Sequence, residues 1–480
     1  MSGSLSPAIL WFRDDLRLSD NPPLHAAAAQ PVLPVYVLDD DGAGTWAAGG
    51  AQRWWLHHSL AALTDSLRQR GVELLLLRGR AERLIPELAA RLGAPAVNAT
   101  ASVAPWARRR DAAVAEALGR QGRALLLHNP LLADPDRLRT GQGKPYSVYT
   151  PFARAVMNLG EPPPPIPAPD ALRGTGRDIQ GLALDELGLL PRAPNPDWAR
   201  AFHDLWQPGE AGARARLEAF LEDALGDYPE GRNRPGEDGS SRLSAHLRWG
   251  EISPRQVWHA ARDAGLPATA TQAFLKEILW REFAQHMLWH RPEMPEQPLH
   301  ASYAYFPYRR DAGTQRAWRR GITGYPLVDA GMRQLWRLGW MHNRVRMICA
   351  SFFIKHLLQP WQDGAAWFWD TLVDADLASN AFNWQWVAGC GADAAPFFRV
   401  FNPILQGESF DPRGEYVRHF VPELARLPDK WLHRPWEAPA EVLRTAGLRL
   451  GEDYPLPVID HATGRARALE ALAEMRKAAA

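Results

Sequence analysis

The sequence predicts an α/β domain followed by an all-helical domain, and three observations support this prediction. Short, continuous apolar runs alternate with helical stretches in the first third of the chain. A proline-rich segment, EPPPPIPAPD (161–170), interrupts that pattern. After Trp206 the sequence consists of long amphipathic segments without a strand pattern. Because a chain of 480 residues is too long for one ordinary hydrophobic core, separate domains of different class are expected.

The first domain is expected over residues 1–130. Amphipathic segments rich in Ala and Leu, such as 53–70 and 81–92, lie between its apolar runs. Strands buried on both faces are apolar throughout, so this order predicts a doubly wound parallel sheet with helices on both faces. WFRDDLRLSDN stands where a G-x-G-x-x-G would follow the first strand, so the common dinucleotide-binding fingerprint is absent. The expected strands are AILWF (8–12), VLPVYVL (32–38), ELLLL (73–77), PAVN (95–98) and ALLLH (124–128).

A long interdomain linker is expected over residues 131–205, and the helical domain over residues 206–480. Proline fixes φ and lacks the N–H donor, so segment 161–170 can be neither a helix nor a central strand. The expected helices of the last domain are 212–224, 254–264, 267–290, 326–338, 342–358, 364–374 and 419–426.

The composition narrows the possible classes of function. No run reaches the ~18 uninterrupted apolar residues that a membrane-spanning helix needs. The chain has two cysteines, Cys349 and Cys390, which cannot form a disulfide framework and which favour a cytoplasmic location. A formal net charge of +1 gives no bulk attraction to nucleic acid, so any nucleic-acid site must be a local patch. Tryptophan is unusually frequent, and indole suits both base stacking and one-electron oxidation.

The stretch DGSSRLS (238–244) is a candidate phosphate site. Its Asp-Gly pair predicts a turn, and the serines lead into an apolar helical run. Hydroxyl and N–H groups at a helix N-terminus bind phosphate, and the helix dipole adds to the attraction. The alternative is an ordinary serine N-cap.

Glu277, Trp280 and Arg281 are spaced i, i+3 and i+4, so they share one face of a predicted helix. An acid, an indole and a guanidinium together suit the wall of a ligand pocket. The alternative is a surface ion pair beside a buried tryptophan. Glu282 falls on another face and is expected to be a salt-bridge partner.

The segment GWMHNRVRM places His342, Asn343, Arg344 and Arg346 at the start of a helix that then becomes strongly apolar. Such a start is a poor core and a good floor for a polar pocket. No second His or Cys stands at metal-ligand spacing, so no metal site is expected.

The segment VDADLASN brings Asp374 and Asp376 close to Asn380 in the sequence. The two carboxylates can hold Arg346 on one side and a ligand on the other, or they belong to a capping turn, and both readings can hold at once. Trp384 and Trp386 are ~200° apart on a helix and therefore face opposite ways. One can serve an inner ligand while the other lines an opening.

With these segments assembled, the chain resembles the photolyase/cryptochrome flavoproteins, most closely the class I cyclobutane pyrimidine dimer photolyases. The motifs stand in the family's order and at similar spacing, and with the WFRDDLRLSDN opening they cover nearly the whole chain. They are DGSSRLSAHLRWGEISPRQ, EILWREF, TGYPLVDAGMRQL, GWMHNRVRM, DADLASN and NWQWVAGCGADAAPFFRVFNP.

The resemblance implies a monomeric, light-driven enzyme that repairs damaged DNA. In the family, excited FADH⁻ donates an electron to a flipped-out pyrimidine dimer, the cyclobutane ring splits, and the electron returns. The resemblance places the Asp374–Arg346 pair beside the flavin ring and Asn380 at the flavin N5. The residues that it implies for FAD are Tyr228, Ser240, Ser241, Arg242, Leu243, Ser244, Arg281, Asn343, Arg346, Asp374, Asp376 and Asn380.

The same resemblance implies how the lesion and its strand are bound. A damaged, poorly stacked pair can be flipped for about a few kcal/mol. Tryptophan faces then contact the dimer, Glu277 hydrogen-bonds its polar edge, and arginines bind the phosphates. The residues implied for the dimer are Glu277, Trp280, Asn343, Met347 and Trp386, and those for the DNA backbone are Arg232, Arg344 and Arg399.

The sequence departs from the family in its chain of electron-transfer residues. Trp384 matches the proximal member and Trp361 the middle one, but Tyr308 stands where the distal tryptophan is usual. Tyrosine must lose its phenolic proton to be oxidised favourably. We therefore expect photoreduction that is slower, more pH-dependent, or rerouted through another aromatic residue, such as Trp318, Trp336 or Trp369.

A second departure concerns an antenna chromophore. Relatives often bind methenyltetrahydrofolate or a deazaflavin in the N-terminal domain. Here Ser102, Trp106 and Ala107 stand where acidic and amide contacts would be expected. The identity of an antenna is therefore open.

Three other functions compete with repair of cyclobutane dimers. A cryptochrome-like blue-light photoreceptor is disfavoured because five residues are present together. They are Glu277, Trp280, Met347, Asn380 and Trp386. A (6-4) photolyase usually has two histidines in its lesion pocket, whereas here Asn343 follows His342. A nucleotide-binding protein with a helical RNA-binding domain is disfavoured because the first domain lacks phosphate-loop and adenylation motifs.

Overall fold

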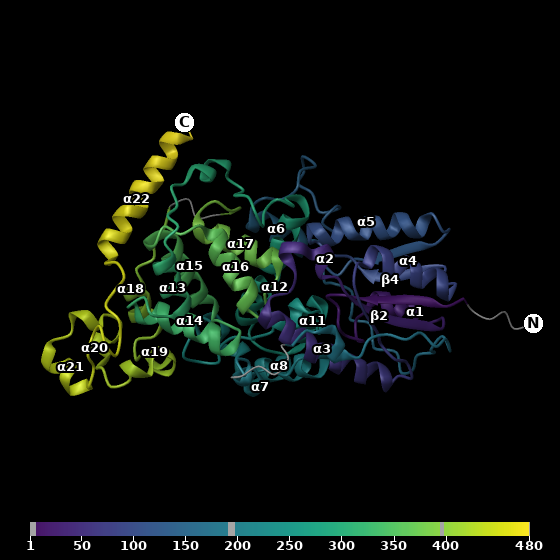
Figure 1. Ribbon diagram of the computed structural model, residues 1–480, viewed down its shortest axis with the longest axis horizontal. Coiled ribbons are helices and arrows are strands. Elements are labelled where there is room, and N and C mark those ends of the chain that lie inside the picture. Colours follow the sequence, from purple (N-terminus) through teal and green to yellow (C-terminus); the bar gives the residue numbers. More distant parts are fainter. Residues whose placement is uncertain (1–5, 191–196, 394–397, 480) are drawn as a thin grey trace, which may run out of the picture. The chain divides into compact units, whose positions relative to one another are not determined.

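The computed structural model describes residues 6–190, 197–393 and 398–479, which form two compact units (Figure 1). Residues 241–292, expected in the helical domain, are compact with the sheet, so the chain passes between the units more than once. The domain boundaries at residues 130 and 205 stay a prediction. The first unit comprises Met1–Gly226, Ser241–Pro292 and Val373–Ala378, and the second comprises Asp227–Ser240, Glu293–Leu372 and Ser379–Ala480.

The first unit contains a five-stranded sheet with the order β3-β2-β1-β4-β5, in which every pairing is parallel. The expected parallel sheet is therefore confirmed. The strand order reverses between β1 and β4, the position at which open parallel sheets usually bind ligands. The strands are β1 (Ala8–Phe12), β2 (Val32–Leu38), β3 (Leu75–Arg78), β4 (Ala96–Thr100) and β5 (Ala124–His128).

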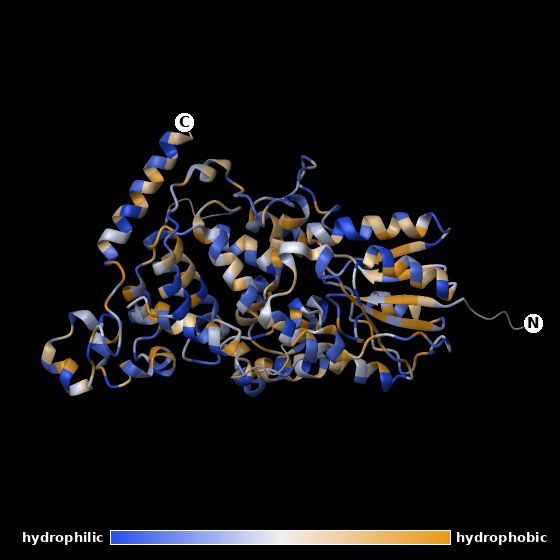
Figure 2. Cartoon of the chain, in the orientation of Figure 1, coloured by the Kyte–Doolittle hydropathy of each residue, from blue (hydrophilic) through white to orange (hydrophobic). Residues whose placement is uncertain are grey.

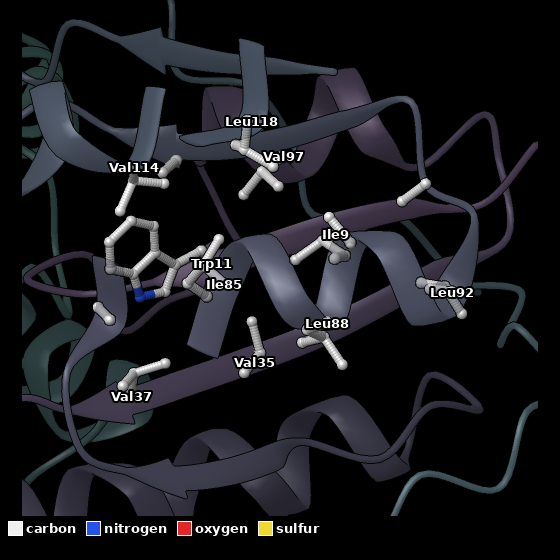
Figure 3. Close-up of a cluster of buried hydrophobic side chains, with 14 of the residues drawn as sticks. Ile9, Trp11, Val35, Val37, Ile85, Leu88, Leu92, Val97, Val114 and Leu118 are labelled. Carbon is white, nitrogen blue, oxygen red and sulfur yellow. The ribbon is translucent and has the colours of Figure 1, made fainter. Parts of the chain in front are cut away.

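Apolar side chains bury both faces of the sheet. Ile9 and Trp11 of β1 pack against α4 (Ala81–Leu92) and α5 (Pro105–Gly119) in the core shown in Figure 3. Leu10 points to the opposite face by the alternation of a strand, and it is completely buried as well. The strands are largely hydrophobic in Figure 2, whereas the helices are mixed. Burial on both faces explains why the strands are apolar throughout.

The remaining helices of the first unit lie between its strands or after the last strand in the sequence. The helix α6 lies within the expected linker 131–205 and packs against α12, whereas segment 161–170 has neither helix nor strand, as predicted. These helices are α1 (Pro22–Ala27), α2 (Asp40–Ala43), α3 (Gly50–Arg68), α6 (Tyr149–Met157), α7 (Arg200–Leu205), α8 (Glu210–Asp223), α10 (Ser244–Arg248), α11 (Pro254–Asp263) and α12 (Ala268–His290).

The second unit is built from helices. The expected helix 342–358 is α15 followed by a π-helical turn, Phe352–His356. The expected helix 419–426 is wrong: α19 ends at Phe420, because Pro422 disfavours a helical conformation for the residue before it. The helices are α9 (Tyr228–Gly231), α13 (Ala312–Arg320), α14 (Pro326–Leu338), α15 (Asn343–Ser351), α16 (Trp361–Thr371), α17 (Leu377–Ala388, which begins in the first unit), α18 (Pro403–Phe410), α19 (Glu415–Phe420), α20 (Asp429–Leu432), α21 (Ala440–Ala446) and α22 (His461–Ala478).

Candidate active site

The predicted site residues fall in both compact units. Residues 394–397 of the last family-like motif lie outside the described residues. The first unit holds Ser241, Arg242, Leu243, Ser244, Glu277, Trp280, Arg281, Asp374 and Asp376, and the second holds Tyr228, Arg232, Ser240, Tyr308, Asn343, Arg344, Arg346, Met347, Trp361, Asn380, Trp384, Trp386 and Arg399.

The serine-rich stretch of the first unit forms a turn before α10. Leu243 is the N-cap of this helix and no side chain caps it, so the alternative of a serine N-cap is wrong. Arg242 has φ of 50°, a left-handed conformation that a non-glycine residue keeps only where its surroundings hold it. The Ser241 carbonyl accepts a hydrogen bond of 2.8 Å from Arg216 Nε, which fixes the turn. Hydroxyl and guanidinium donors thus stand on one short turn, as phosphate binding requires.

The helix α12 is continuous, so Glu277, Trp280 and Arg281 share a face as predicted. Arg281 donates two hydrogen bonds of 3.4 Å, one to Glu282 Oε1 and one to the Leu247 carbonyl, and its side chain is 22% exposed. Hydrogen bonds of that length are weak. The guanidinium can therefore exchange them for a stronger anionic partner.

The indole of Trp280 lies face to face with the phenol ring of Tyr149. The ring centroids are 3.5 Å apart and the planes differ by 5°. Tyr149 is the first residue of α6 and donates its O–H to the Lys276 carbonyl on α12 at 2.9 Å. Trp280 is half-buried, so it is neither a fully buried core residue nor an exposed one.

Glu282 is buried and joins α12 to the segment that precedes α6. Its Oε2 accepts a hydrogen bond of 2.9 Å from the Leu132 N–H, and its Oε1 faces Arg281. Burial raises the pKa of Glu282 to about 7, although Arg281 and the N–H groups of Leu132 and Ala133 oppose that shift. The expected salt-bridge partner is thus mainly a buried link between two segments of the first unit.

The aspartate segment, Val373–Asp376, is held in the first unit by three side chains. Arg248 Nε donates to the Ala375 carbonyl at 2.7 Å, and Trp249 Nε1 donates to the Val373 carbonyl at 3.0 Å. Gln285 Nε2 donates to both carboxylate oxygens of Asp376, at 3.1 and 3.0 Å. Asp374 in the same segment is 6% exposed. The Asp376 carboxylate is thereby fixed as a hydrogen-bond acceptor.

In the second unit, α15 begins with the predicted polar cluster. His342 is its N-cap and accepts a hydrogen bond of 3.2 Å from the Arg344 N–H through Nδ1, so this histidine has a structural role. Asn343 is exposed at the first position of the helix. Arg346 Nε donates to the Met341 carbonyl at 2.6 Å, which directs the guanidinium.

Arg232, Arg344 and Arg399 form an arginine cluster in the second unit. The pKa of Arg344 is lowered, first by burial and then by the positive charges of Arg232 and Arg399. Arg344 also donates a hydrogen bond of 2.5 Å to Asn233 Oδ1, and Arg399 is exposed. Mutual repulsion of cations is relieved when they bind an anion such as phosphate.

Asn380 and Trp386 are both half-buried on α17, and each is oriented by one hydrogen bond. Asn380 Nδ2 donates to the Ala365 carbonyl at 3.0 Å, which leaves Oδ1 as an acceptor. Trp386 Nε1 donates to the Asp393 carbonyl at 3.1 Å.

Trp384 lies on the buried side of α17, at 3% exposure, so the prediction that Trp384 and Trp386 face opposite ways is confirmed. Its ring packs against those of Phe368 and Trp318, with ring centroids 5.0 and 6.3 Å apart. A Cβ at Gly364 would lie 2.2 Å from the Trp384 ring, so the indole packs directly on the backbone of α16.

Trp361 and Tyr308, the other two predicted electron-transfer residues, do not form a continuous chain of ring contacts with Trp384 in the part of the chain that the structure describes. Trp361 is completely buried, and Tyr308 packs on Phe306 with ring centroids 4.7 Å apart. Within the described residues, no ring contact joins Trp361 to Trp384 or to Tyr308. Burial, followed by the neighbouring Cys390 and Tyr303, raises the pKa of Tyr308 well above its ordinary value.

A polar cluster lies at the carboxyl ends of β1 and β4, in the region where an antenna was considered. Arg13 Nη1 contacts both carboxylate oxygens of Asp111 at 2.6 Å. The guanidinium of Arg110 lies over the rings of Trp11 and Trp106, at 4.7 and 5.0 Å. The charged groups of this cluster therefore have partners within the first unit.

Sequence reasoning missed Tyr149, Gln285 and Gly364, which hold predicted site residues in place. Tyr149 and Gln285 contact residues that are remote in the sequence, so local spacing gave no signal for them. Gly364 carries a weak signal. A glycine inside a helix costs about 1 kcal/mol relative to alanine, which suggests a close approach of another group.

The part of the chain that the structure describes has neither a membrane-spanning helix nor a metal-binding cluster. No helix there is long and apolar enough to cross a membrane. No group of three or more His, Cys, Asp or Glu side chains in that part of the chain is arranged to hold a metal ion.

Comparison with known proteins identifies the family. A family model for DNA photolyase matches residues 8–170, and a model for the FAD binding domain of DNA photolyase matches residues 274–474. Deoxyribodipyrimidine photo-lyase of Agrobacterium fabrum is 50% identical over 482 residues, which cover 99% of this chain and 100% of that protein. This chain belongs to the photolyase/cryptochrome family.

The photolyase/cryptochrome fold extends over both compact units. The crystal structure of a bacterial class III photolyase from Agrobacterium tumefaciens superimposes with a TM-score of 0.96 at 50% identity, and it covers 99% of each chain. The expected resemblance to class I is therefore not confirmed. Cryptochrome-1 of Arabidopsis thaliana is also related, at 37% identity over 99% of this chain and 72% of that protein.

Residues within the photolyase-type FAD-binding domain, and on the turn that precedes it in the sequence, carry groups that fit the cofactor. Hydroxyl and guanidinium donors stand on the turn before α10 and on α12, and they suit the two phosphates of FAD. The carboxylates of the aspartate segment are acceptors, which suit the hydroxyl and N–H groups of the ribose and the flavin ring.

Proposed function

We propose that this protein is a light-driven photolyase that repairs cyclobutane pyrimidine dimers in DNA with reduced FAD as its cofactor. The main support is the face of α12, where Glu277, Trp280 and Arg281 stand together. A pyrimidine dimer has apolar faces and polar edges, so an indole and a carboxyl group suit it. The guanidinium suits a phosphate of the cofactor.

The proposed FAD ligands are those that the resemblance implies. Bound, reduced FAD supplies the light-absorbing electron donor. The chain's own contribution is to bind and orient it: serine hydroxyls and Arg281 bind phosphate, and the aspartate segment accepts hydrogen bonds. Asn380 contributes Oδ1 as an acceptor beside the flavin N5, since its Nδ2 is already bonded to the Ala365 carbonyl.

The proposed binding of DNA combines two kinds of contact. The arginine cluster binds phosphates of either damaged or intact DNA, which sets affinity but not specificity. Trp280 and Trp386 contact the faces of the flipped dimer, and Glu277 hydrogen-bonds its edge. Selectivity arises because a damaged pair costs less to flip than an intact one.

Repair under light tests this proposal. The reduced protein is mixed with an oligothymidylate that carries cyclobutane dimers, and the ultraviolet absorbance of thymine is followed under near-ultraviolet light and in the dark. We expect absorbance to recover only in the light, and Trp280→Ala to recover it more slowly at low DNA concentration.

A blue-light photoreceptor is the second candidate, because plant cryptochromes are among the relatives at 37% identity. A flavin-loaded, fully reduced sample that restores no thymine would contradict dimer repair. An oligonucleotide with a (6-4) lesion would then separate a (6-4) photolyase from a photoreceptor.

A further inference from the structure

The stack of Tyr149 on Trp280 is a close, parallel aromatic contact in the first unit. The centroids are 3.5 Å apart with 5° between the planes, so one face of the indole is covered by the phenol ring. Substrate can therefore contact only the opposite face or the edge of Trp280. The covering residue comes from α6, in the stretch that the sequence predicted to be a linker.

Tyr149 is itself held firmly. Its O–H donates to the Lys276 carbonyl at 2.9 Å, and in an α-helix that carbonyl also accepts the N–H of Trp280. Burial, and then the negative charge of Glu277, raise the pKa of Tyr149, so the phenol stays protonated as a donor. Phe283 packs against the rings of Tyr149 and Trp280, at 6.0 and 6.1 Å. The phenol thus stacks on the Trp280 side chain and hydrogen-bonds the carbonyl one helical turn before Trp280.

We propose that Tyr149 is a positioning residue that fixes the indole of Trp280 in the orientation that receives the pyrimidine dimer. The inference rests on the proposed function, in which Trp280 contacts the dimer. A half-buried tryptophan without this partner would lose side-chain freedom on binding, and that loss weakens affinity. The stack removes this freedom before DNA arrives.

The docking of α6 on α12 does not depend on Tyr149 alone. Phe152 of α6 packs against Phe283 and His286 of α12, both with centroids 5.1 Å apart. Loss of the phenol ring is therefore expected to release the indole while the two helices stay together.

Binding of DNA by ring-deleted and ring-conserved variants tests the inference. The dissociation constants of Tyr149→Leu and Tyr149→Phe are measured for a dimer-bearing oligonucleotide and for the same undamaged sequence. We expect Tyr149→Leu to weaken binding of the damaged DNA about 2- to 10-fold, with undamaged DNA unchanged. Tyr149→Phe keeps the ring and is expected to stay close to wild type. Tyr146→Leu is the matched control, because Tyr146 precedes Tyr149 in the same segment and its ring contacts Phe152 of α6 and His286 of α12.

A double-mutant cycle separates positioning from a general loss of structure. If Tyr149 acts through Trp280, Tyr149→Leu has no further effect on damaged DNA when Trp280→Ala is already present. Additive effects would overturn the inference, as would equal affinities of Tyr149→Leu and wild type. If Tyr149→Leu does not fold, Tyr149→Met takes its place in the same cycle. A wild-type protein that does not prefer damaged DNA would overturn the proposed function, and this inference with it.

Discussion

The aspartate segment with α12 and the arginine cluster are two regions built for opposite purposes. In the first, Asp374 is buried, Asp376 is half-buried, and their segment is bound by Arg248, Trp249 and Gln285. In the second, cations lie close enough to repel one another, and Arg399 is exposed. The first region is organised before any ligand binds, as a cofactor site requires, whereas the second gains its stabilising partners from a polyanion. The aspartate segment and α12 thus provide a site of fixed shape, and the arginine cluster provides long-range attraction for an anion.

The largest expected effect is loss of FAD from Arg281→Leu. The variant removes the guanidinium on α12 that is proposed to bind a phosphate of FAD. Loss of such a charge-assisted contact weakens binding on the order of 100-fold. The measurement is the flavin-to-protein ratio of the purified protein and its recovery on adding FAD. Arg68→Leu is the control, because Arg68, the last residue of α3, is exposed and forms a surface ion pair with Glu73. A variant that keeps a full complement of flavin would contradict the proposed phosphate role.

Glu282→Gln is expected to change the pH dependence of stability. The pKa of Glu282 is raised to about 7, so its contribution to folding is fully present below the ordinary pKa of 4.5 and is lost as the pH rises through about 7. Glutamine stays neutral and can still accept from the Leu132 N–H. The variant should therefore match wild type near pH 4.5 and exceed it at pH 8, by on the order of 3 kcal/mol. The measurement is the thermal unfolding of both proteins from pH 4.5 to pH 8. If their stabilities change with pH in the same way, ionisation of Glu282 does not oppose folding.

Arg344→Gln is expected to weaken DNA binding by a smaller and less specific amount. Because the arginine cluster is proposed to bind phosphates, damaged and undamaged DNA should lose affinity by the same factor. The slope of log K against log salt should fall by about 0.9 for the lost contact. Arg449→Gln, at an exposed residue paired with Asp453, is the control. A loss confined to damaged DNA would place Arg344 in the lesion site instead.

The smallest effect on repair, and a clear one on photoreduction, is expected for Tyr308→Trp. A half-buried tyrosine with a raised pKa releases its proton reluctantly, so tryptophan should accelerate photoreduction and remove its pH dependence. Repair by protein that is already reduced should be unchanged. If the rate and pH profile of photoreduction stay as in wild type, the route avoids Tyr308. Trp318→Phe would then be expected to slow it, since Trp318 contacts Trp384.

The fold could be predicted because its signals are local. Continuous apolar runs gave the strands of a sheet buried on both faces, and periodicity gave α14 over the predicted residues 326–338. The error at residues 419–426 came from extending a helical pattern past the constraint of Pro422. Motifs also located the candidate residues, because helical spacing puts Glu277, Trp280 and Arg281 on one face.

What holds those residues could not be predicted, because the contacts join distant segments. Nothing near Trp280 in the sequence indicates Tyr149, and the predicted linker gave no reason to look for a site residue there. The family motifs did not distinguish residues that contact a ligand from residues that hold other parts of the protein in place. Arg248 and Trp249 belong to such a motif, and in the structure they hold the aspartate segment.

The packing of Trp384 on Gly364 means that substitutions at these two positions are expected to be correlated. The spacing of α16 and α17 at this point is the thickness of one indole ring against bare backbone, since even a methyl group at Gly364 would overlap the ring. A change at either position alone leaves a clash or a void. Related proteins are therefore expected to exchange these two residues together, so that a larger residue at one is accompanied by a smaller ring at the other.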